Sequence, residues 1–248
     1  MSTYAAVAHT TYVAGYDMTG DTNNTTLSLP YDALDNTRFR SGTGVRGRTR
    51  QAGLQDVSSS VNGFWTDDED AIDETAWAAL GGPTQVVTQS VTGSDGDRAY
   101  FYQAGVFEYS LFGNVGELIP FSLNLQGARG NGSMAAGAVP GTLLVAKAEV
   151  DATGATGAEV ELGEVAAGQY LYASFHVFAR DTTITAVLES DEDDTFGGAT
   201  TRATFGPLTA TGGTWAARVA GPITDTWYRI RVSAITGSHT IAAAAGIK

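Results

Sequence analysis

Strict alternation of apolar and polar residues is the pattern that most constrains the fold of this chain. Within residues 117–126 four apolar residues fall on one face: Ile119, Phe121, Leu123 and Leu125. The polar positions Ser122, Asn124 and Gln126 fall on the other face, and residues 57–61 likewise place both valines on one face and Ser58 and Ser60 on the other. A period of two is that of a β-strand. One face of each such strand is expected to pack in a core while the other meets water or another subunit.

Composition extends this prediction to the whole chain. Of the 248 residues 31 are glycine and only 17% are charged, against about 25% in typical domains. Short strands joined by glycine-rich turns have this composition. An aromatic-rich strand is predicted at 98–110, with Gly105 as a bulge or bend. The sequence therefore predicts an all-β fold with enough apolar content to exclude disorder.

One short helix is predicted at residues 68–80. Thr66 is placed to cap it, and the acidic residues 67–70 fall in the first turn, where the helix dipole favours anions. Gly81 and Gly82 offer a left-handed cap at its end, and Pro83 prevents continuation.

Two glycine-rich segments suggest how the chain is divided. Residues 127–140 are predicted to be a loop, and residues 151–158 resemble a linker. Strands are expected beyond it, with no helical periodicity between them, at 169–178, 184–189, 215–219 and 227–235. We therefore expect a β-sandwich with a flanking helix over residues 1–150 and a separable antiparallel β-sandwich over 159–248.

The net charge of −13 argues against binding to nucleic acid or to anionic membranes, which needs lysine and arginine. The chain has no cysteine and no apolar run long enough to span a membrane. The first ten residues lack the features of a signal peptide, so we expect a cytoplasmic or virion product.

An arginine-rich segment is the sharpest local feature. Five of the fourteen basic residues lie among glycine and threonine within residues 38–50: Arg38, Arg40, Arg46, Arg48 and Arg50. The favoured interpretation is an arm that docks on an acidic patch of a neighbouring subunit, with Phe39, Val45 and Leu54 as apolar anchors. A solvated loop and a contact with nucleic acid are the alternatives.

Residues for catalysis are scarce. His9, His176 and His239 lie in unrelated segments, with His176 expected at the surface or partly buried, and no known nucleophile or phosphate-binding motif occurs. We predict no enzyme activity, no catalytic residue, no cofactor and no metal site. The acidic runs 67–74 and 191–194 carry the oxygen ligands of calcium without EF-hand spacing, and solvated acid is the preferred interpretation.

The aromatic residues of the C-terminal half are either core residues or a sugar-binding platform: Tyr170, Tyr172, Trp215, Trp227 and Tyr228. For Trp215 and Trp227 the core is the favoured interpretation.

The order of phrases over residues 12–150 resembles the tail tube (major tail) protein of siphophages. These phrases are YDMTGDTNNTTLSL, DALDNTRFR, GLQDVSSSVNGFW, the acidic helix, GELIPFSLNLQG and GTLLVAKAEV. The resemblance implies a β-sandwich with a flanking helix at 68–80 and a long loop at 36–55 that bridges successive rings. It also implies a homo-oligomer of stacked hexameric rings in the virion tail, made in the host cytoplasm. DNA would pass through it without specific binding, and tape measure and tail terminator proteins would be its partners.

The C-terminal part departs from a minimal tube protein and is similar to Ig-like or jelly-roll-like decoration domains. This similarity keeps an alternative function open, that of a capsid decoration or carbohydrate-binding protein acting through the C-terminal sandwich. The acidic composition fits a channel wall that repels phosphates, and it fits an ordinary soluble surface equally well.

Overall fold

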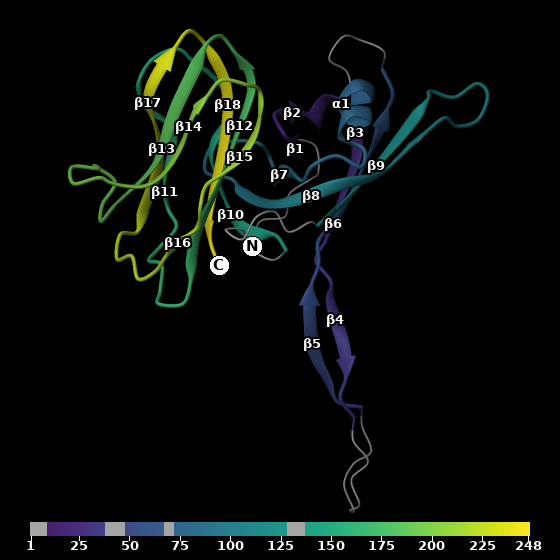
Figure 1. Cartoon of the computed structure of the whole chain (residues 1–248), viewed down its shortest axis with the longest axis horizontal. Helices are drawn as coiled ribbons and strands as arrows, with labels where there is room; N and C mark the ends of the chain where they lie inside the picture. The colour runs from purple at the N-terminus through teal and green to yellow at the C-terminus, as the bar shows by residue number, and fades with distance from the viewer. Residues whose placement is uncertain (1–8, 38–47, 67–71, 128–136) are drawn as a thin grey trace, which may run out of the picture.

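The described part of the chain is mostly β-strand, as the alternation predicts (Figure 1). The structure is a computed structural model, and it describes residues 9–37, 48–66, 72–127 and 137–248. The elements up to the middle of the chain are β1 (Thr10–Val13), β2 (Tyr16–Asp17), the 3-10 helix η1 (Met18–Gly20), β3 (Thr22–Ser28), β4 (Tyr31–Asp35), β5 (Arg50–Gln55), β6 (Ser58–Phe64), α1 (Ile72–Ala79), β7 (Gln85–Ser90), β8 (Arg98–Leu111), β9 (Pro120–Gly127) and β10 (Val139–Val150). They are followed by β11 (Gly154–Glu161), β12 (Tyr170–Arg180), β13 (Thr183–Asp191), β14 (Thr200–Leu208), β15 (Gly212–Trp215), β16 (Val219–Ala220), β17 (Trp227–Thr236) and β18 (His239–Ile247).

One edge of strand β8 is divided between two neighbours, while β7 pairs with residues 99–104 along the other edge. Residues 98–101 pair with β10, whereas residues 104–111 pair with β9. The path β8–β10–β18–β12 leads into the C-terminal half, and the path β8–β9–β6–β3 forms a branch, here called the branch sheet. The two remaining sheets are the four-stranded β11–β17–β13–β14 and the two-stranded β4–β5.

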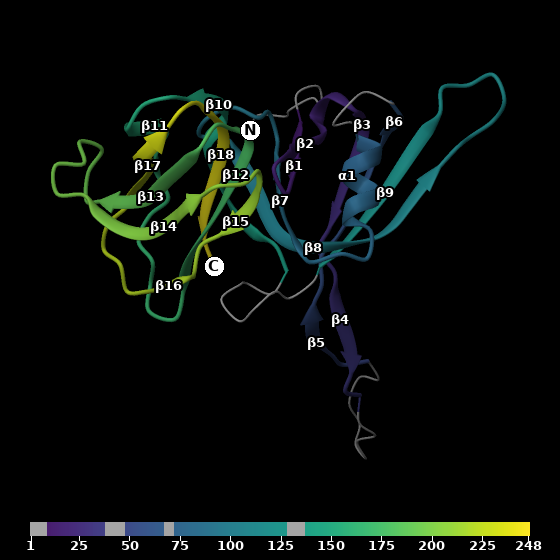
Figure 2. The same cartoon turned by 45° about the horizontal axis from the view of Figure 1, so that its top comes forward.

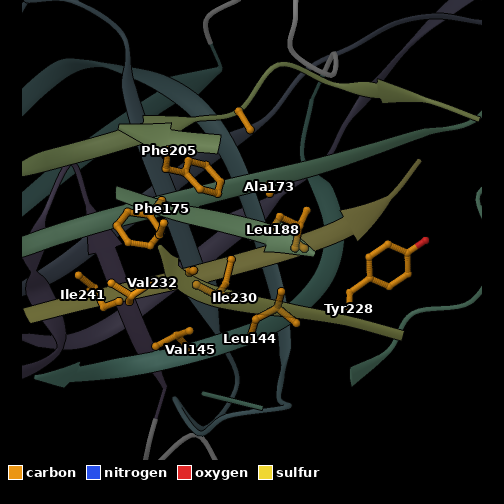
Figure 3. Packing of buried hydrophobic residues seen from close by; sticks show 14 of the residues in the cluster. Leu144, Val145, Ala173, Phe175, Leu188, Phe205, Tyr228, Ile230, Val232 and Ile241 are labelled. Carbon is orange, nitrogen blue, oxygen red and sulfur yellow. The ribbon is translucent and has the colours of Figure 1, made fainter. Parts of the chain in front are cut away.

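The C-terminal core lies between the sheet β11–β17–β13–β14 and the strands β10, β12 and β18. Leu144, Phe175, Leu188, Phe205 and Ile230 are among its buried side chains, and Figure 3 shows them converging from both sides. The rings of Phe175 and Phe205 stack with centroids 5.1 Å apart. Burial of each such side chain contributes about 1.5–3 kcal/mol, so this cluster is a major source of stability.

The second core lies on one face of the branch sheet, where α1 and β1 cover it. Val61, Leu123 and Leu125 point from the sheet toward Ile72 and Ala76 of the helix. The helix is described from Ile72, because residues 67–71 lie outside the described part, and it ends at Ala79. Gly81 has the left-handed conformation expected of the cap, with φ +66°, and its N–H donates to the Val106 carbonyl.

Two segments that the sequence predicts to be irregular contain strands. The expected linker 151–158 largely forms β11, which pairs with β17. The expected loop 36–55 ends in β5, which pairs with β4. In both cases a long-range partner supplies backbone hydrogen bonds that composition cannot reveal. The predicted strand at 215–219 is divided between β15 and β16.

The predicted division of the chain after residue 150 stays a prediction, and β10 bears on it. This strand pairs with β18, the last strand, and contributes Leu144 and Val145 to the C-terminal core. A cut after Val150 would therefore remove β10 from the sandwich to which it belongs.

A buried histidine ties the two halves together. His176 is fully buried on β12, which corrects the expectation of a surface or partly buried residue. Its Nδ1 accepts from the Gly15 N–H at 3.3 Å, so its Nε2 carries the proton and donates to Thr88 Oγ1 at 2.9 Å. Thr88 Oγ1 also lies 3.1 Å from Ser174 Oγ. The contact joins the β1–β2 turn, β7 and β12.

We predict that this contact makes the protein sensitive to acid. Burial lowers the pKa of His176 from 6.5 to about 3. The folded state holds the imidazole neutral, so its contribution is complete above pH 6.5 and is lost as the pH falls below that value. The expected slope approaches about 1.4 kcal/mol per pH unit down to pH 3. Unfolding by denaturant at pH 8, 6 and 5 measures this slope.

His176→Gln should lower the free energy of unfolding at pH 8 and flatten its dependence between pH 6.5 and 5. Thr88→Val removes a hydrogen bond without removing the titrating group, so it should destabilise the protein and keep the slope. An unchanged slope in His176→Gln would show that other groups control the acid response.

Candidate functional site

Strands β4 and β5 form an exposed two-stranded ribbon that stands away from the body of the protein (Figures 1 and 2). Tyr31 pairs with Gln55 at its base and Asp35 pairs with Arg50 further out. Its apolar side chains are left in water, with Tyr31 56%, Leu34 55% and Leu54 80% exposed. A lone two-stranded ribbon is marginally stable, and exposed apolar groups on such an element are typical of a binding surface.

The residues predicted for inter-subunit contact belong to this segment. Arg48, Arg50 and Leu54 lie exposed on the ribbon or next to it. The other five fall outside the described residues: Arg38, Phe39, Arg40, Val45 and Arg46. Their role in docking therefore stays a prediction.

The base of the ribbon is fixed by hydrogen bonds from three parts of the chain. The Asp56 N–H donates to the Pro30 carbonyl at 2.9 Å and closes the two strands. Lys248 Nζ donates to Gln55 Oε1 at 2.9 Å and to the Ala138 carbonyl at 3.0 Å. Burial lowers the pKa of Lys248. The C-terminal residue of the sequence thus reaches the point where the ribbon leaves the body.

The face of the branch sheet that turns away from α1 forms a second candidate surface, here called the polar face. Strand register brings its side chains into rows across four strands. The first row is Asn24, Asn62, Ser122 and Ser110, and the second is Thr26, Ser60, Asn124 and Glu108. The third row is Ser28, Ser58 and Gln126.

The polar face is almost uncharged, although the chain carries a net charge of −13. Glu108 is the one charged side chain in these rows, and its Oε2 accepts from Asn124 Nδ2 at 2.7 Å. The remaining side chains end in hydroxyl or amide groups. Such a surface is well hydrated but has no cation to attract a polyanion. The sequence placed Ser122, Asn124 and Gln126 on a solvent or subunit face, but it could not supply the register that joins them to β3 and β6.

Both outer strands of the branch sheet have an open edge. Within the described residues β3 pairs only with β6, and residues 107–111 of β8 pair only with β9. Strand β3, with the sequence TNNTTLS, has no charge or proline to block a further strand. Open edges of this kind are templates for pairing with another chain.

The described residues do not form the alternative sites considered from the sequence. The predicted sugar platform is divided, because Tyr228 is in the C-terminal core while Trp215 packs between Phe101 and Tyr172 on another sheet. Near residues 191–194, Asp191 accepts from the Gly198 N–H and Asp193 from Thr195. No group of three or more histidine, cysteine or acidic side chains suited to a metal occurs in the described part. No helix there is long and apolar enough to cross a membrane.

Comparison with known proteins identifies no family. No family model and no curated protein matches the sequence. A chain from the virion of a native gene transfer agent particle is 16% identical, with a TM-score of 0.41 over 52% of this chain and 96% of that one. The Dit protein of phage SPP1, described as part of a hub adsorption apparatus, is 13% identical, with a TM-score of 0.34 over 97% and 99%. A chain of the phage p2 baseplate is 8% identical, with a TM-score of 0.34 over 95% and 97%. Likenesses this distant do not define the family of the chain.

We predict that Lys248 holds the base of the ribbon. Lys248→Met removes two hydrogen bonds from a partly buried ammonium group, at a cost of about 1–3 kcal/mol in the free energy of unfolding. Hydrogen exchange should become faster at residues 54–57. Lys147→Met is the control, because its ammonium group is partly exposed and its pair with Asp17, which is not part of the ribbon base, is worth about 0–1 kcal/mol. Equal exchange at 54–57 in both variants would contradict the assignment.

Proposed function

We propose that this chain is a structural subunit of a phage virion tail, which assembles with copies of itself into stacked rings around a channel for DNA. The resemblance of residues 12–150 to siphophage tail tube proteins suggests this role, and the ring number it implies is six. The exposed ribbon is the observation that carries the proposal. Its partners would be further copies of the chain and the tape measure and tail terminator proteins, in a virion made in the host cytoplasm.

The ribbon supports stacking because it keeps apolar side chains in water until a partner covers them. Full burial of Tyr31, Leu34 or Leu54 would stabilise a contact by about 1.5–3 kcal/mol each. Ion pairs formed by Arg48 and Arg50 at an exposed surface would add only about 0–1 kcal/mol each. Apolar contacts therefore provide most of the affinity, and the arginines select an acidic partner.

The open edges of the branch sheet support ring formation. A strand from a neighbouring copy at β3 or β8 would satisfy backbone groups that face water in the single chain. Closure of such contacts around a symmetry axis leaves no free edge.

The polar face would then line the channel. Passing DNA should not bind the wall, and binding requires cations that replace its counterions. The polar face would avoid binding DNA because its rows contain no lysine or arginine. Repulsion by acidic groups would contribute little, since Glu108 is the one charged side chain in these rows. The acidity of the chain would lie on other surfaces.

The alternative functions, capsid decoration and carbohydrate binding through the C-terminal sandwich, have less support. Carbohydrate binding would use an aromatic platform, and the described aromatic residues are spread over two sheets.

We predict that Leu34→Ser with Leu54→Ser prevents stacking. Both side chains are exposed, so the free energy of unfolding of the single subunit should change by no more than about 0.5 kcal/mol. Negative-stain microscopy and sedimentation should show tubes for the wild type and single rings or free subunits for the variant. Ala33→Ser with Ala52→Ser, on the same two strands, is the matched control. Normal tubes from the leucine variant would remove the ribbon from assembly, and a wild type that forms neither rings nor tubes would refute the proposed function.

We also predict that lysine on the polar face gives assembled tubes an affinity for DNA. Ser122→Lys and Gln126→Lys lie on β9, which is paired on both sides, so the open edges stay intact. Retention of labelled DNA should rise above the wild type and fall steeply with salt. Thr200→Lys with Thr201→Lys adds the same charge on β14 as a control. Equal retention by the two lysine variants would show that the polar face does not line the channel.

A further inference from the structure

The branch sheet has two chemically different ends. At one end Ser28, Ser58 and Gln126 adjoin the base of the ribbon. Strand pairing places Phe64, Pro120 and Leu111 at the opposite end, because β6 runs from the ribbon to Phe64 and β9 returns from Pro120. The connection between β8 and β9 projects on the side of the molecule away from the ribbon (Figures 1 and 2).

This opposite end is apolar and exposed, and we call it the apolar end. Its side chains are Phe64, Phe112, Val115, Leu118 and Ile119. Phe112 is 78% exposed and Leu118 is 70% exposed. A hydrogen bond of 2.9 Å from the Trp65 N–H to the Ile119 carbonyl joins the two chain segments that carry these residues. So many large apolar side chains gathered at one place on a surface are typical of an interaction site.

The charges near the two ends are complementary. The sequence of residues 31–55 carries five arginines and two aspartates, whereas the rest of the chain is strongly acidic. Asp73 and Glu74 lie on α1, and Asp73 accepts from Tyr109 Oη of β8 at 2.9 Å. Glu117 lies in the β8–β9 connection itself, where its Oε2 accepts from Asn114 Nδ2 at 3.2 Å. Asp73 and Glu117 thus place carboxylates beside the apolar end.

We infer that the apolar end of one copy receives the ribbon of a second copy. This inference rests on the proposed function and names the surface that completes the stack. Tyr31, Leu34 and Leu54 of the ribbon would pack on Phe64, Phe112 and Leu118. Arg48 and Arg50 would face the carboxylates of Asp73, Glu74 and Glu117. Because the two surfaces differ and lie at opposite ends, the contact is heterologous and repeats from copy to copy as an open stack.

Contacts between like ends are disfavoured by the same charges. Two ribbons placed side by side would bring arginines together, and two apolar ends would bring Glu117 and Asp73 near their own counterparts. Like charges in a contact reduce its affinity, so charge directs the ribbon to the apolar end.

The absence of cysteine from the chain allows a direct test by disulfide trapping. Leu54→Cys and Leu118→Cys are made as separate variants, mixed in equal amounts under assembly conditions and oxidised. We expect a cross-linked dimer of the two variants. Leu54→Cys mixed with Thr200→Cys is the matched control, because Thr200 is exposed on β14, outside the branch sheet.

The double variant Leu54→Cys with Leu118→Cys distinguishes stacking from contacts within a ring. A head-to-tail stack gives a ladder of covalent oligomers that continues beyond the number of subunits in one ring, whereas contacts within a ring end at that number. Tubes that form without a Leu54–Leu118 cross-link, or with a ladder that ends at the ring number, would overturn this inference and leave the proposed function standing. Failure of the wild type to assemble would refute the proposed function itself.

Discussion

The divided pairing of β8 is the constraint on which the arrangement of the whole chain depends. One strand of 14 residues pairs with β10 through its first part and with β9 through its second. A register shift between Val106 and Glu108 follows directly after Gly105, as the sequence predicted for a bulge or bend. A Cβ at Gly105 would stand 2.8 Å from the ring of Phe107, so the bare backbone lets that ring lie across the strand. The C-terminal sandwich and the branch sheet are therefore held by one continuous strand.

Two sets of hydrogen bonds reinforce this arrangement outside the apolar cores. His176 joins β12 to Thr88 and to the β1–β2 turn, and Lys248 joins the end of β18 to the base of the ribbon. Gly15 is required at the first of these contacts, because a Cβ there would stand 2.5 Å from the Val177 carbonyl. Each contact links segments far apart in the sequence, and the Lys248 contact ties the C-terminal half to the base of the ribbon.

The sequence correctly predicted features that depend only on residues close together in the chain. Alternation assigned Val61, Leu123 and Leu125 to a core face because successive side chains of a strand point to opposite sides whatever they pair with. The left-handed cap at Gly81 was predicted correctly for the same reason. Errors arose where distant partners decide the structure. Residues 151–158 resemble a linker, but most of them form a strand that pairs with β17. His176 was expected at the surface or partly buried, but it is fully buried and bonded to Thr88 of β7. The rows of the polar face depend on the register of four strands, which no local pattern contains.

The pairing of β4 with β5 reduces the conformational entropy that docking would cost. Ordering about 15 residues of free backbone would cost on the order of 15 kcal/mol or more, which exposed ion pairs cannot offset. Residues 31–35 and 50–55 are already paired as strands, and the hydrogen bond between Asp56 and Pro30 closes their base. A partner therefore meets a largely formed surface, and preorganisation of this kind raises affinity by reducing the entropy lost on binding. Few apolar contacts then suffice, which is consistent with a ribbon that carries only Tyr31, Leu34 and Leu54 as large exposed apolar side chains in its described part.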